Sequence, residues 1–317
     1  MALKQNDMKS IPLYSPLVSI ALCTYNGEKY LKQQIESIIY QTYENIEIII
    51  IDDCSTDNTF DLLQVLTKDI KNVRLEQNLQ NLGFIKNFEK AIRYCNGEYI
   101  AISDQDDIWS LDKVEILLKN IGNHGMIFHD SLIIDEQGEQ IENLKLSDMT
   151  KIYKGDSNLY FLVNNCIPGH ASMFKNDIIA YAMPFDKRFF HDWWLAFVAA
   201  SVSSITYVPD TLVKYRQHNN NVTDILFKRS ENDQSRDIYS NYNIDWIEYL
   251  SKFIHLKNTK EIQFIYKVLS DYRKGIKGLQ FMRFLVRYHI KLFNLEKKSY
   301  LSRINLARKL YWAKSVK

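Results

Sequence analysis

Hydrophobic residues alternate between short continuous runs and amphipathic stretches over the first 105 residues of the chain. Three mostly apolar runs, typical of strands covered on both faces, occur at residues 17–23, 46–51 and 99–103, and a further strand is expected at residues 72–75. Three stretches with helical spacing of apolar positions lie between them, at residues 28–40, 56–66 and 82–94. This alternation predicts right-handed βαβ units and a doubly wound α/β sheet.

The pattern is less regular in the second half of the chain. It predicts helices at 111–120 and 191–200 and strands at 126–134 and 172–174. After residue 221 the composition changes to helical periodicity without Pro and with many Lys, Arg and Tyr. We therefore expect a first domain at residues 1–224 and a basic, helical carboxyl-terminal region at residues 225–317.

Charge is distributed unevenly between these two parts. Residues 225–317 contain 20 Lys and Arg against 8 Asp and Glu, a net charge of +12, which leaves −10 for residues 1–224 because the whole chain carries +2. Aromatic and aliphatic residues alternate with Arg283, Arg287 and Lys291. This pattern favours association with the inner leaflet of a membrane over nucleic-acid binding. A helical cap on the fold or an oligomerisation element is the alternative.

The composition indicates an ordinary globular protein, with 46% hydrophobic and 25% charged residues. Four scattered Cys without a CxxC motif fit a reducing compartment. The first 16 residues lack the apolar core of a signal peptide, and no apolar stretch is long enough to span a membrane. We expect a cytoplasmic protein that is peripheral on the cytoplasmic face of the membrane.

Candidate chemistry lies where three of the expected strands end. Polar clusters follow them at 24–27 (TYNG), 52–55 (DDCS) and 104–107 (DQDD). Ligands bind at the carboxyl ends of the strands in open parallel sheets, and carboxylates crowded there need a compensating cation. An Asp-x-Asp pattern suits Mg²⁺ or Mn²⁺, which can bridge a diphosphate. Each cluster taken alone also fits a solvated turn or helix cap.

The motifs resemble those of glycosyltransferase family 2, whose members have the GT-A fold. The resemblance is carried by VSIALCTYNGEKYLKQQIESIIYQTYENIEIIIIDDCSTDNT, NLGFIKNFEKAI and GEYIAISDQDDIW, and it extends over residues 16–224. SDQDDIW, FHDWW and YRQHNNN together are similar to a bacterial rhamnosyltransferase-like branch that builds cell-surface polysaccharide. The resemblance thus implies a GT-A domain followed by a helical extension.

The resemblance also implies roles for individual residues. The nucleotide pocket would be formed by Thr24, Tyr25, Asn26, Glu28, Asp52, Asp53, Lys86 and Asp104. Asp106 would bind Mn²⁺ or Mg²⁺, and His218 would complete the metal or diphosphate site. Asp192 would be the general base, although the family's usual Glu-Asp pair is His191-Asp192 here. The processive QxxRW signature is absent, so one sugar is expected per encounter.

Residues around Asp192 bear on its chemistry and on the acceptor. Its aromatic neighbours in the sequence should raise the pKa of the Asp192 carboxyl, although an Asp here also fits a helix N-cap. Trp193 and Trp194 can stack on an acceptor sugar or pack in the core. His170 is expected in a tight turn beneath the acceptor.

We therefore expect an inverting, metal-dependent glycosyltransferase with a nucleoside diphosphate sugar as donor. The acceptor would be a hydroxyl of a lipid-linked glycan or oligosaccharide. The branch resemblance favours dTDP-rhamnose, and a UDP-hexose of the galactose or glucose type is the alternative donor. A sugar nucleotidyltransferase and a non-catalytic scaffold for glycan assembly remain as other classes. Homo-oligomer formation is left open, and no nucleic-acid partner is expected.

Overall fold

The structure is a computed structural model of the chain, and it describes residues 14–219, 221, 244–274, 287–288 and 301. The expected domain boundary near residue 224 and most of the basic segment around Arg283 and Lys291 lie outside the described residues. The division into two domains therefore stays a prediction.

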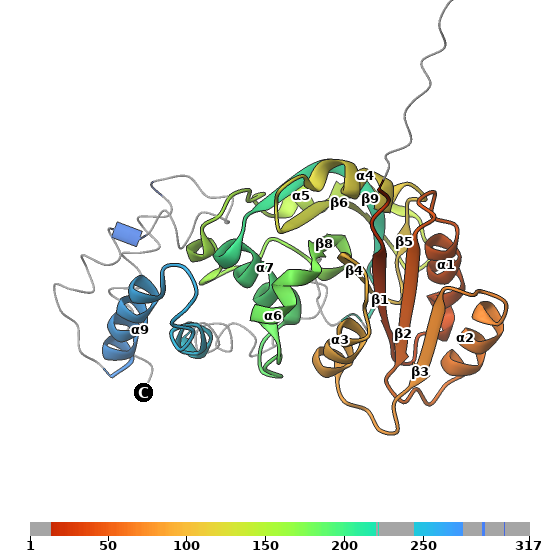
Figure 1. The fold of residues 1–317 in the computed structure, drawn as a ribbon, viewed down its shortest axis with the longest axis horizontal. Helices are drawn as coiled ribbons and strands as arrows, with labels where there is room; N and C mark the ends of the chain where they lie inside the picture. The colour runs from red at the N-terminus through yellow and green to blue at the C-terminus, as the bar shows by residue number, and fades with distance from the viewer. Residues whose placement is uncertain (1–13, 220, 222–243, 275–286, 289–300, 302–317) are drawn as a thin grey trace, which may run out of the picture.

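The core of the molecule is a nine-stranded sheet with the order β3-β2-β1-β4-β8-β6-β9-β5, and β7 pairs with β6 (Figure 1). The first four strands are parallel, and they are β1 (Val18–Thr24), β2 (Ile46–Asp52), β3 (Val73–Gln77) and β4 (Tyr99–Ser103). The remaining strands are β5 (Ile108–Trp109), β6 (Met126–Ile134), β7 (Gln140–Lys145), β8 (Ser172–Lys175) and β9 (Ile205–Arg216). In this second half β6 and β9 are parallel and the other pairings are antiparallel.

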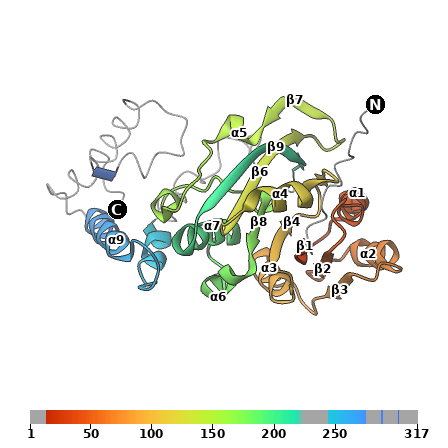
Figure 2. The same cartoon turned by 45° about the horizontal axis from the view of Figure 1, so that its top comes forward.

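Helices cover both faces of the sheet (Figures 1 and 2). The α-helices are α1 (Glu28–Ile39), α2 (Thr59–Thr67), α3 (Phe84–Arg93), α4 (Lys113–Ile121), α5 (Leu146–Met149), α6 (Ile179–Ala182), α7 (His191–Val202) and α9 (Thr259–Arg273). Three short 3-10 helices are η1 (Asn158–Phe161), η2 (Gly169–Ala171) and η3 (Asn176–Ile178). Side chains alternate along β1, so Ile20 and Leu22 pack with α1 and α4, whereas Ala21 and Cys23 pack with α3 and α7.

The sequence-based expectation of an α/β sheet flanked by helices is confirmed. The expected strands at 99–103 and 126–134 have the observed bounds of β4 and β6. The antiparallel strand β8 between β4 and β6 was not expected beside β4. Pairing between strands about 70 residues apart leaves no periodic signal in the sequence.

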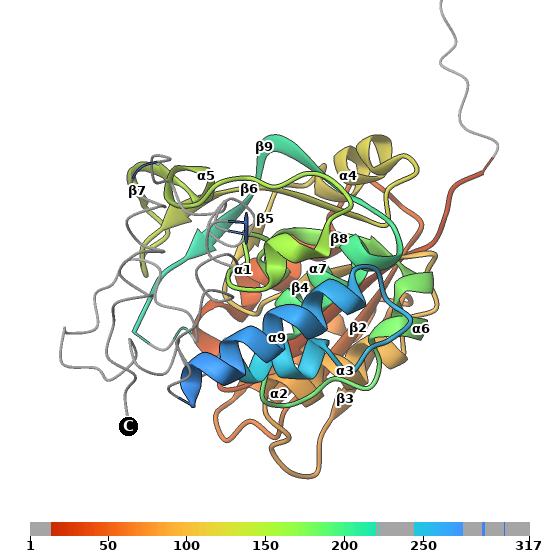
Figure 3. The same ribbon diagram turned by 90° about the vertical axis from the view of Figure 1, so that its left-hand side faces the viewer.

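The described part of the carboxyl-terminal region belongs to the same core as α7. Residues 244–250 are helical, and the Trp246 side chain is completely buried beside Trp193 and Trp194. Trp246 Nε1 donates a hydrogen bond to Phe161 O at 3.0 Å. Figure 3 shows α9 lying across the α7 side of the molecule, with Ile265 buried in the shared core. Residues 244–274 therefore cap this face of the fold.

Among the described residues, none of the helices is both long and apolar enough to span a membrane.

Candidate active site

The loop after β1 is held against the loop after β2. Asn26 adopts a positive φ of 48° and its side-chain oxygen accepts the Thr56 N–H at 2.8 Å. Glu28 accepts hydrogen bonds from the backbone and side chain of Asn58 at 3.0 and 2.8 Å. The predicted nucleotide residues Asn26 and Glu28 thus fix two neighbouring loops at the same sheet edge.

The two carboxylates that end β2 are buried and bound by different loops. Asp52 accepts hydrogen bonds from Thr24 Oγ1 at 2.9 Å, from Ser55, and from Gln77 Nε2 at 3.0 Å. Asp53 accepts the backbone N–H groups of Leu82 and Gly83 at 2.8 and 2.9 Å. Asp52 therefore ties together the ends of β1, β2 and β3, while Asp53 orients the loop that leads into α3.

Tyr25 and Gln105 connect this edge to the loop after β4. The Tyr25 N–H donates to Gln105 Oε1 at 2.8 Å, and Gln105 Nε2 donates to Tyr25 O at 3.0 Å. A Cβ at position 27 would lie only 2.3 Å from Gln105 Oε1, so a larger residue there would displace the Gln105 amide from Tyr25. The Tyr25 side chain is 45% exposed, which leaves its ring open to a ligand.

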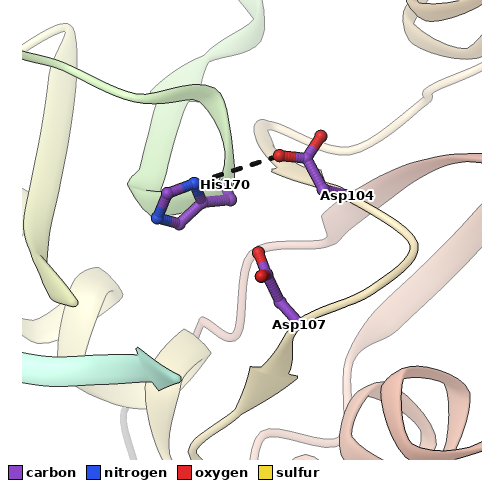
Figure 4. Close-up of side chains that lie close together, drawn as sticks. All are labelled: Asp104, Asp107 and His170. Atoms are coloured by element: carbon purple, nitrogen blue, oxygen red, sulfur yellow. Dashed lines mark ion pairs between the residues drawn. The ribbon is translucent and has the colours of Figure 1, made fainter. Parts of the chain in front are cut away.

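Three potential ligand atoms converge from Asp104, Asp107 and His170, and all lie within 4.8 Å of one another (Figure 4). Asp104 and Asp107 lie in the loop between β4 and β5 and His170 comes from η2, so two segments far apart in the sequence meet here. His170 Nδ1 is 3.9 Å from Asp104 Oδ2, and its Nε2 is hydrogen-bonded to Ser131 Oγ at 3.0 Å. The bond to Ser131 and stacking on Tyr215 orient the imidazole toward the two carboxylates.

The electrostatics of this cluster favour a cation. Enclosure by the protein, together with the charges of Asp106 and Asp192, raises the pKa of Asp104 to about 7, although 40% of its side chain reaches solvent. Burial and the charges of Asp106 and Asp104 raise the pKa of Asp107 well above its usual value. Asp107 Oδ2 is buried without a hydrogen-bond partner among the described residues. Burial also lowers the pKa of His170, which keeps the imidazole neutral and able to ligate.

These donors fit a hard divalent ion. Carboxylate oxygens and a neutral imidazole are ligands that Mn²⁺ accepts, and an unpartnered buried carboxylate oxygen is relieved by a cation. The residues present therefore suit the Mn²⁺ or Mg²⁺ expected from the sequence.

Asp106 and His218 also meet at this edge. His218 Nε2 lies 2.8 Å from Asp106 Oδ2, and Asn221 Nδ2 lies 3.4 Å from the same oxygen. Arg216 is buried beneath them and donates from Nε to the carbonyl oxygen of Asp106 at 2.8 Å and from its backbone N–H to Asp107 Oδ1 at 3.0 Å. The structure thus brings the two predicted metal residues into direct contact.

Asp192 is the second residue of α7 and is only partly buried. Its carboxylate accepts the N–H of Trp193 at 2.7 Å and a backbone hydrogen bond from Gly169. Burial raises the pKa of Asp192 to about 6, and its charge contributes to the raised pKa of Asp104. The expected effect of the apolar surroundings on Asp192 is therefore present, and the residue lies in the same electrostatic neighbourhood as the cluster.

Three other predicted residues have different surroundings from those expected. Trp193 and Trp194 are 7% and 2% exposed, and their indole N–H groups donate to main-chain carbonyls. Both indoles are therefore core side chains here, with no face open to an acceptor sugar. Lys86 donates to Glu89 Oε2 and to Phe185 O, each at 2.6 Å, so contact with a diphosphate would require these bonds to break.

The sequence did not indicate that Asp107 and Lys113 lie at this cluster as buried charged residues. Lys113 is completely buried, donates to His170 O at 2.7 Å, and lies 3.3 Å from the centre of the Trp109 ring. Burial lowers the pKa of Lys113, while Asp107 and Asp104 oppose that effect. The adjacent acids of the DQDD motif were a signal for Asp107, whereas a lysine at the start of an amphipathic helix looked like a solvated residue.

Comparisons with known proteins agree with this architecture. The family model of glycosyl transferase family 2 matches residues 19–181. An uncharacterized glycosyltransferase of Haemophilus influenzae is 28% identical over 324 residues, covering 92% of this chain and 98% of the relative. A putative teichuronic acid biosynthesis glycosyltransferase, TuaG of Bacillus subtilis, is 36% identical over 102 residues, covering 32% of this chain and 40% of TuaG.

Two solved structures have a similar fold. The mannosyltransferase PcManGT of Pyrobaculum calidifontis, in complex with GDP-Man and Mn²⁺, has a TM-score of 0.54 at 16% identity, covering 94% of this chain and 80% of that one. S. aureus TarS 1–349, in complex with UDP-GlcNAc, has a TM-score of 0.53 at 14% identity, covering 87% and 81%. The matched family model spans about half of the chain and includes the loops that carry most of the site, so the protein belongs to glycosyltransferase family 2 and has the GT-A fold.

Proposed function

We propose that this protein is an inverting, metal-dependent glycosyltransferase that moves one sugar from a nucleoside diphosphate to an acceptor hydroxyl. The observation that carries the proposal is the meeting of two groups of different chemistry at one sheet edge. Asp104, Asp106 and Asp107 supply cation ligands, and Asp192 supplies a carboxylate whose pKa is raised to about 6. Membership of family 2 supports a nucleotide-sugar donor.

In this proposal separate groups of residues bind the nucleotide and the metal ion. The loops of Thr24, Tyr25 and Asp53 hold the nucleotide, with the exposed Tyr25 ring against the base or ribose. The carboxylates, with His170 and His218, hold a Mn²⁺ or Mg²⁺ ion, which when bound neutralises the departing diphosphate. Two ligand sets are proposed for this ion, Asp106 with His218 and Asp104 with Asp107 and His170, because the side chains within each set lie close together.

Asp192 takes the proton of the acceptor hydroxyl. The oxygen then attacks the anomeric carbon from the face opposite the diphosphate, and the carbon–oxygen bond to the diphosphate breaks. Because burial raises the pKa of Asp192, its carboxylate is a stronger base than a solvated Asp while remaining ionised at neutral pH. A single displacement of this kind inverts the anomeric configuration.

The donor and acceptor are proposed from sequence motifs, a relative and composition rather than from contacts in the structure. The motifs SDQDDIW, FHDWW and YRQHNNN favour dTDP-rhamnose, with a UDP-hexose as the alternative. A glycan of the cell surface, lipid-linked or oligosaccharide, is the proposed acceptor, and the similarity to TuaG, a putative teichuronic acid biosynthesis glycosyltransferase, supports this class. The basic composition of residues 225–317 supports a cytoplasmic enzyme docked on the inner leaflet.

A thermal-shift panel tests the proposed activity. Purified protein is heated with dTDP-rhamnose, UDP-glucose, UDP-galactose, UDP-GlcNAc or GDP-mannose, each with and without Mn²⁺. A donor that binds the folded protein raises the melting temperature, and we expect one nucleotide class to do so only with Mn²⁺. Release of the nucleoside diphosphate in the presence of acceptor, detected by a coupled assay, then establishes transfer.

Two further assays separate the competing classes. Pyrophosphate release from a nucleoside triphosphate and a sugar 1-phosphate would identify a sugar nucleotidyltransferase. Binding of a donor without turnover under any acceptor or metal condition would identify a scaffold. Either result would overturn the proposed transfer.

A further inference from the structure

His191 has an unusual environment for a histidine beside a catalytic base. It is the first residue of α7 and is 7% exposed, with its ring stacked on Phe88 at a centroid distance of 4.3 Å. Nδ1 and Nε2 are both buried without a hydrogen-bond partner among the described residues. A neutral imidazole carries one donor and one acceptor, and buried groups of this kind are normally paired.

Gly169 reveals a small space beside this ring. A Cβ built at Gly169 would lie 3.4 Å from His191 Nε2, 3.5 Å from Ile102 Cγ2 and 3.6 Å from Asp192 Cβ, all ordinary van der Waals contacts. Every other glycine in the described residues either has a positive φ or would place its Cβ within 3.0 Å of a neighbour. Neither constraint requires glycine at position 169. The missing side chain leaves a methyl-sized space bordered by both His191 and the proposed base.

Two exposed aromatic rings pair with each other beside His191, and one of them contacts its imidazole. Phe84 and Phe190 are 38% and 36% exposed, and their ring centroids are 5.8 Å apart. Phe84 also makes an edge contact with His191 at a centroid distance of 6.1 Å. A few polar groups set among apolar rings are typical of a small-molecule site. For a sugar, the hydroxyls would use the polar group and the C–H face of the ring would pack on an aromatic side chain.

We propose that His191, Phe84 and Phe190 form the binding subsite for the acceptor sugar. His191 Nε2 exchanges a hydrogen bond with the hydroxyl next to the one that Asp192 deprotonates, and the two phenylalanines pack on the apolar face of the sugar. This inference rests on the proposed transferase function. It requires side chains around the His191 ring, such as Phe84 at its edge, to shift when the sugar binds, because the imidazole nitrogens are enclosed in the structure.

Three variants test the subsite in the full chain. His191→Phe removes the hydrogen-bonding nitrogens but keeps a flat ring against Phe88. Gly169→Ala fills the space beside Nε2 with a methyl group that the surrounding atoms tolerate. His124→Phe is the matched control, because His124 is bonded to Ser204 near the start of β6 and takes no part in the site.

The kinetic arm uses octyl β-glucoside, β-galactoside and β-N-acetylglucosaminide as acceptors, with the donor identified by the thermal-shift panel. We expect His191→Phe and Gly169→Ala each to raise the acceptor KM about tenfold or more, as the loss of a ligand hydrogen bond does. The donor KM should stay within about twofold for both variants. His124→Phe should leave both KM values unchanged. An unchanged acceptor KM in both site variants overturns the proposal.

The binding arm needs neither donor nor turnover. Protein labelled with ¹⁵N-histidine is titrated with the methyl β-glycosides of the same three sugars, and the His191 resonances are assigned by their absence in His191→Phe. We expect at least one glycoside to shift the His191 Nε2 resonance, and Gly169→Ala to abolish that shift. Absence of any shift in the wild-type protein overturns the proposal even if His191→Phe fails to fold.

The two arms also separate this inference from the proposed function. If the wild-type protein consumes no nucleotide sugar but a glycoside shifts its His191 resonance, the transferase proposal is wrong and the sugar-binding subsite is retained. If the protein transfers sugar, but the site variants leave the acceptor KM unchanged and no glycoside shifts the His191 resonance, the transferase function is retained and the subsite is wrong.

Discussion

His218 Nε2 lies 2.8 Å from Asp106 Oδ2, although the two residues are 112 positions apart in the chain. The contact joins the segment after β9 to the loop after β4. Arg216 fixes the geometry from below, because it bonds the Asp106 carbonyl oxygen and is itself completely enclosed. The Asp106–His218 pair is therefore preorganised before any ligand binds.

We predict that Asp106→Asn and His218→Ala each weaken Mn²⁺ binding and transfer by about 10- to 100-fold, the range seen when groups that hold a metal site are lost. A titration of activity against Mn²⁺, together with isothermal titration calorimetry, measures the effect. His124→Ala is the control for removing a histidine elsewhere in the fold.

Comparison with His170→Ala identifies the ligand set. Loss of Mn²⁺ affinity in His170→Ala alone would assign the ion to Asp104, Asp107 and His170 and would contradict a metal role for His218.

The raised pKa of Asp192 predicts a pH dependence for transfer. A general base acts only when ionised, so kcat/KM should fall tenfold per pH unit below about pH 6 and level off above it. Saturating Mn²⁺ is needed in this experiment, because a bound cation favours ionised Asp104 and removes its titration from the profile. Asp192→Asn should retain donor binding while kcat falls by about 10²- to 10⁴-fold. A rate near that of the wild type would contradict the assignment of Asp192 as base.

Asp107 predicts an unusual dependence of stability on pH. Burial raises the pKa of Asp104 to about 7 and that of Asp107 well above its usual value in the folded state, so each carboxyl still holds its proton in the folded protein at pH values where the unfolded chain has released it. Their contribution to the stability of the metal-free protein should therefore be lost as pH rises from about 4 through the raised pKa values. Lys113 and the buried histidines, whose pKa values are lowered by burial, act in the opposite direction, so the contribution of Asp107 is isolated by comparing a variant with the wild type.

Asp107→Asn tests this explanation. Asn can still accept the Arg216 N–H through Oδ1, while an amide replaces the unpartnered Oδ2. We expect a higher melting temperature than the wild type at pH 8 without metal, and a smaller difference at pH 5, because the raised pKa keeps more of the Asp107 carboxyl protonated at the lower pH. Differential scanning fluorimetry at both pH values measures it. A lower melting temperature at pH 8 would show that the Asp107 charge is already compensated.

Particular residues show how much of the fold and of the site could be predicted from the sequence. Continuous runs such as 46–51 predicted covered parallel strands, and parallel strands necessarily bring their following loops to one edge. The convergence of the clusters at 24–27, 52–55 and 104–107 was therefore predictable. His170 joins Asp104 only because β8 inserts antiparallel beside β4, and such non-local pairing has no local signature.

The burial of amphipathic side chains was also difficult to predict from the sequence. Lys113 is completely enclosed although its type and helical position suggest exposure. The adjacent Trp193 and Trp194 fit either a sugar platform or the core in the sequence, and their burial and the bonds of their indole N–H groups to Phe161 O and Ala182 O distinguish the two.

Trp246 makes the dependence of the fold on residues beyond the expected domain boundary testable. It is fully buried among aromatic side chains of α7 and bonds to Phe161 O, so Trp246→Ala should lower the free energy of unfolding by about 3–5 kcal/mol. Ile254→Ala, at a residue that is 76% exposed, should change it by less than about 0.5 kcal/mol. Urea denaturation followed by tryptophan fluorescence and by circular dichroism gives both values. For the same reason a fragment of residues 1–224 should expose the α7 face and aggregate or melt well below the full chain. A fragment with the melting temperature of the full chain would show that residues 244–274 do not stabilise the fold.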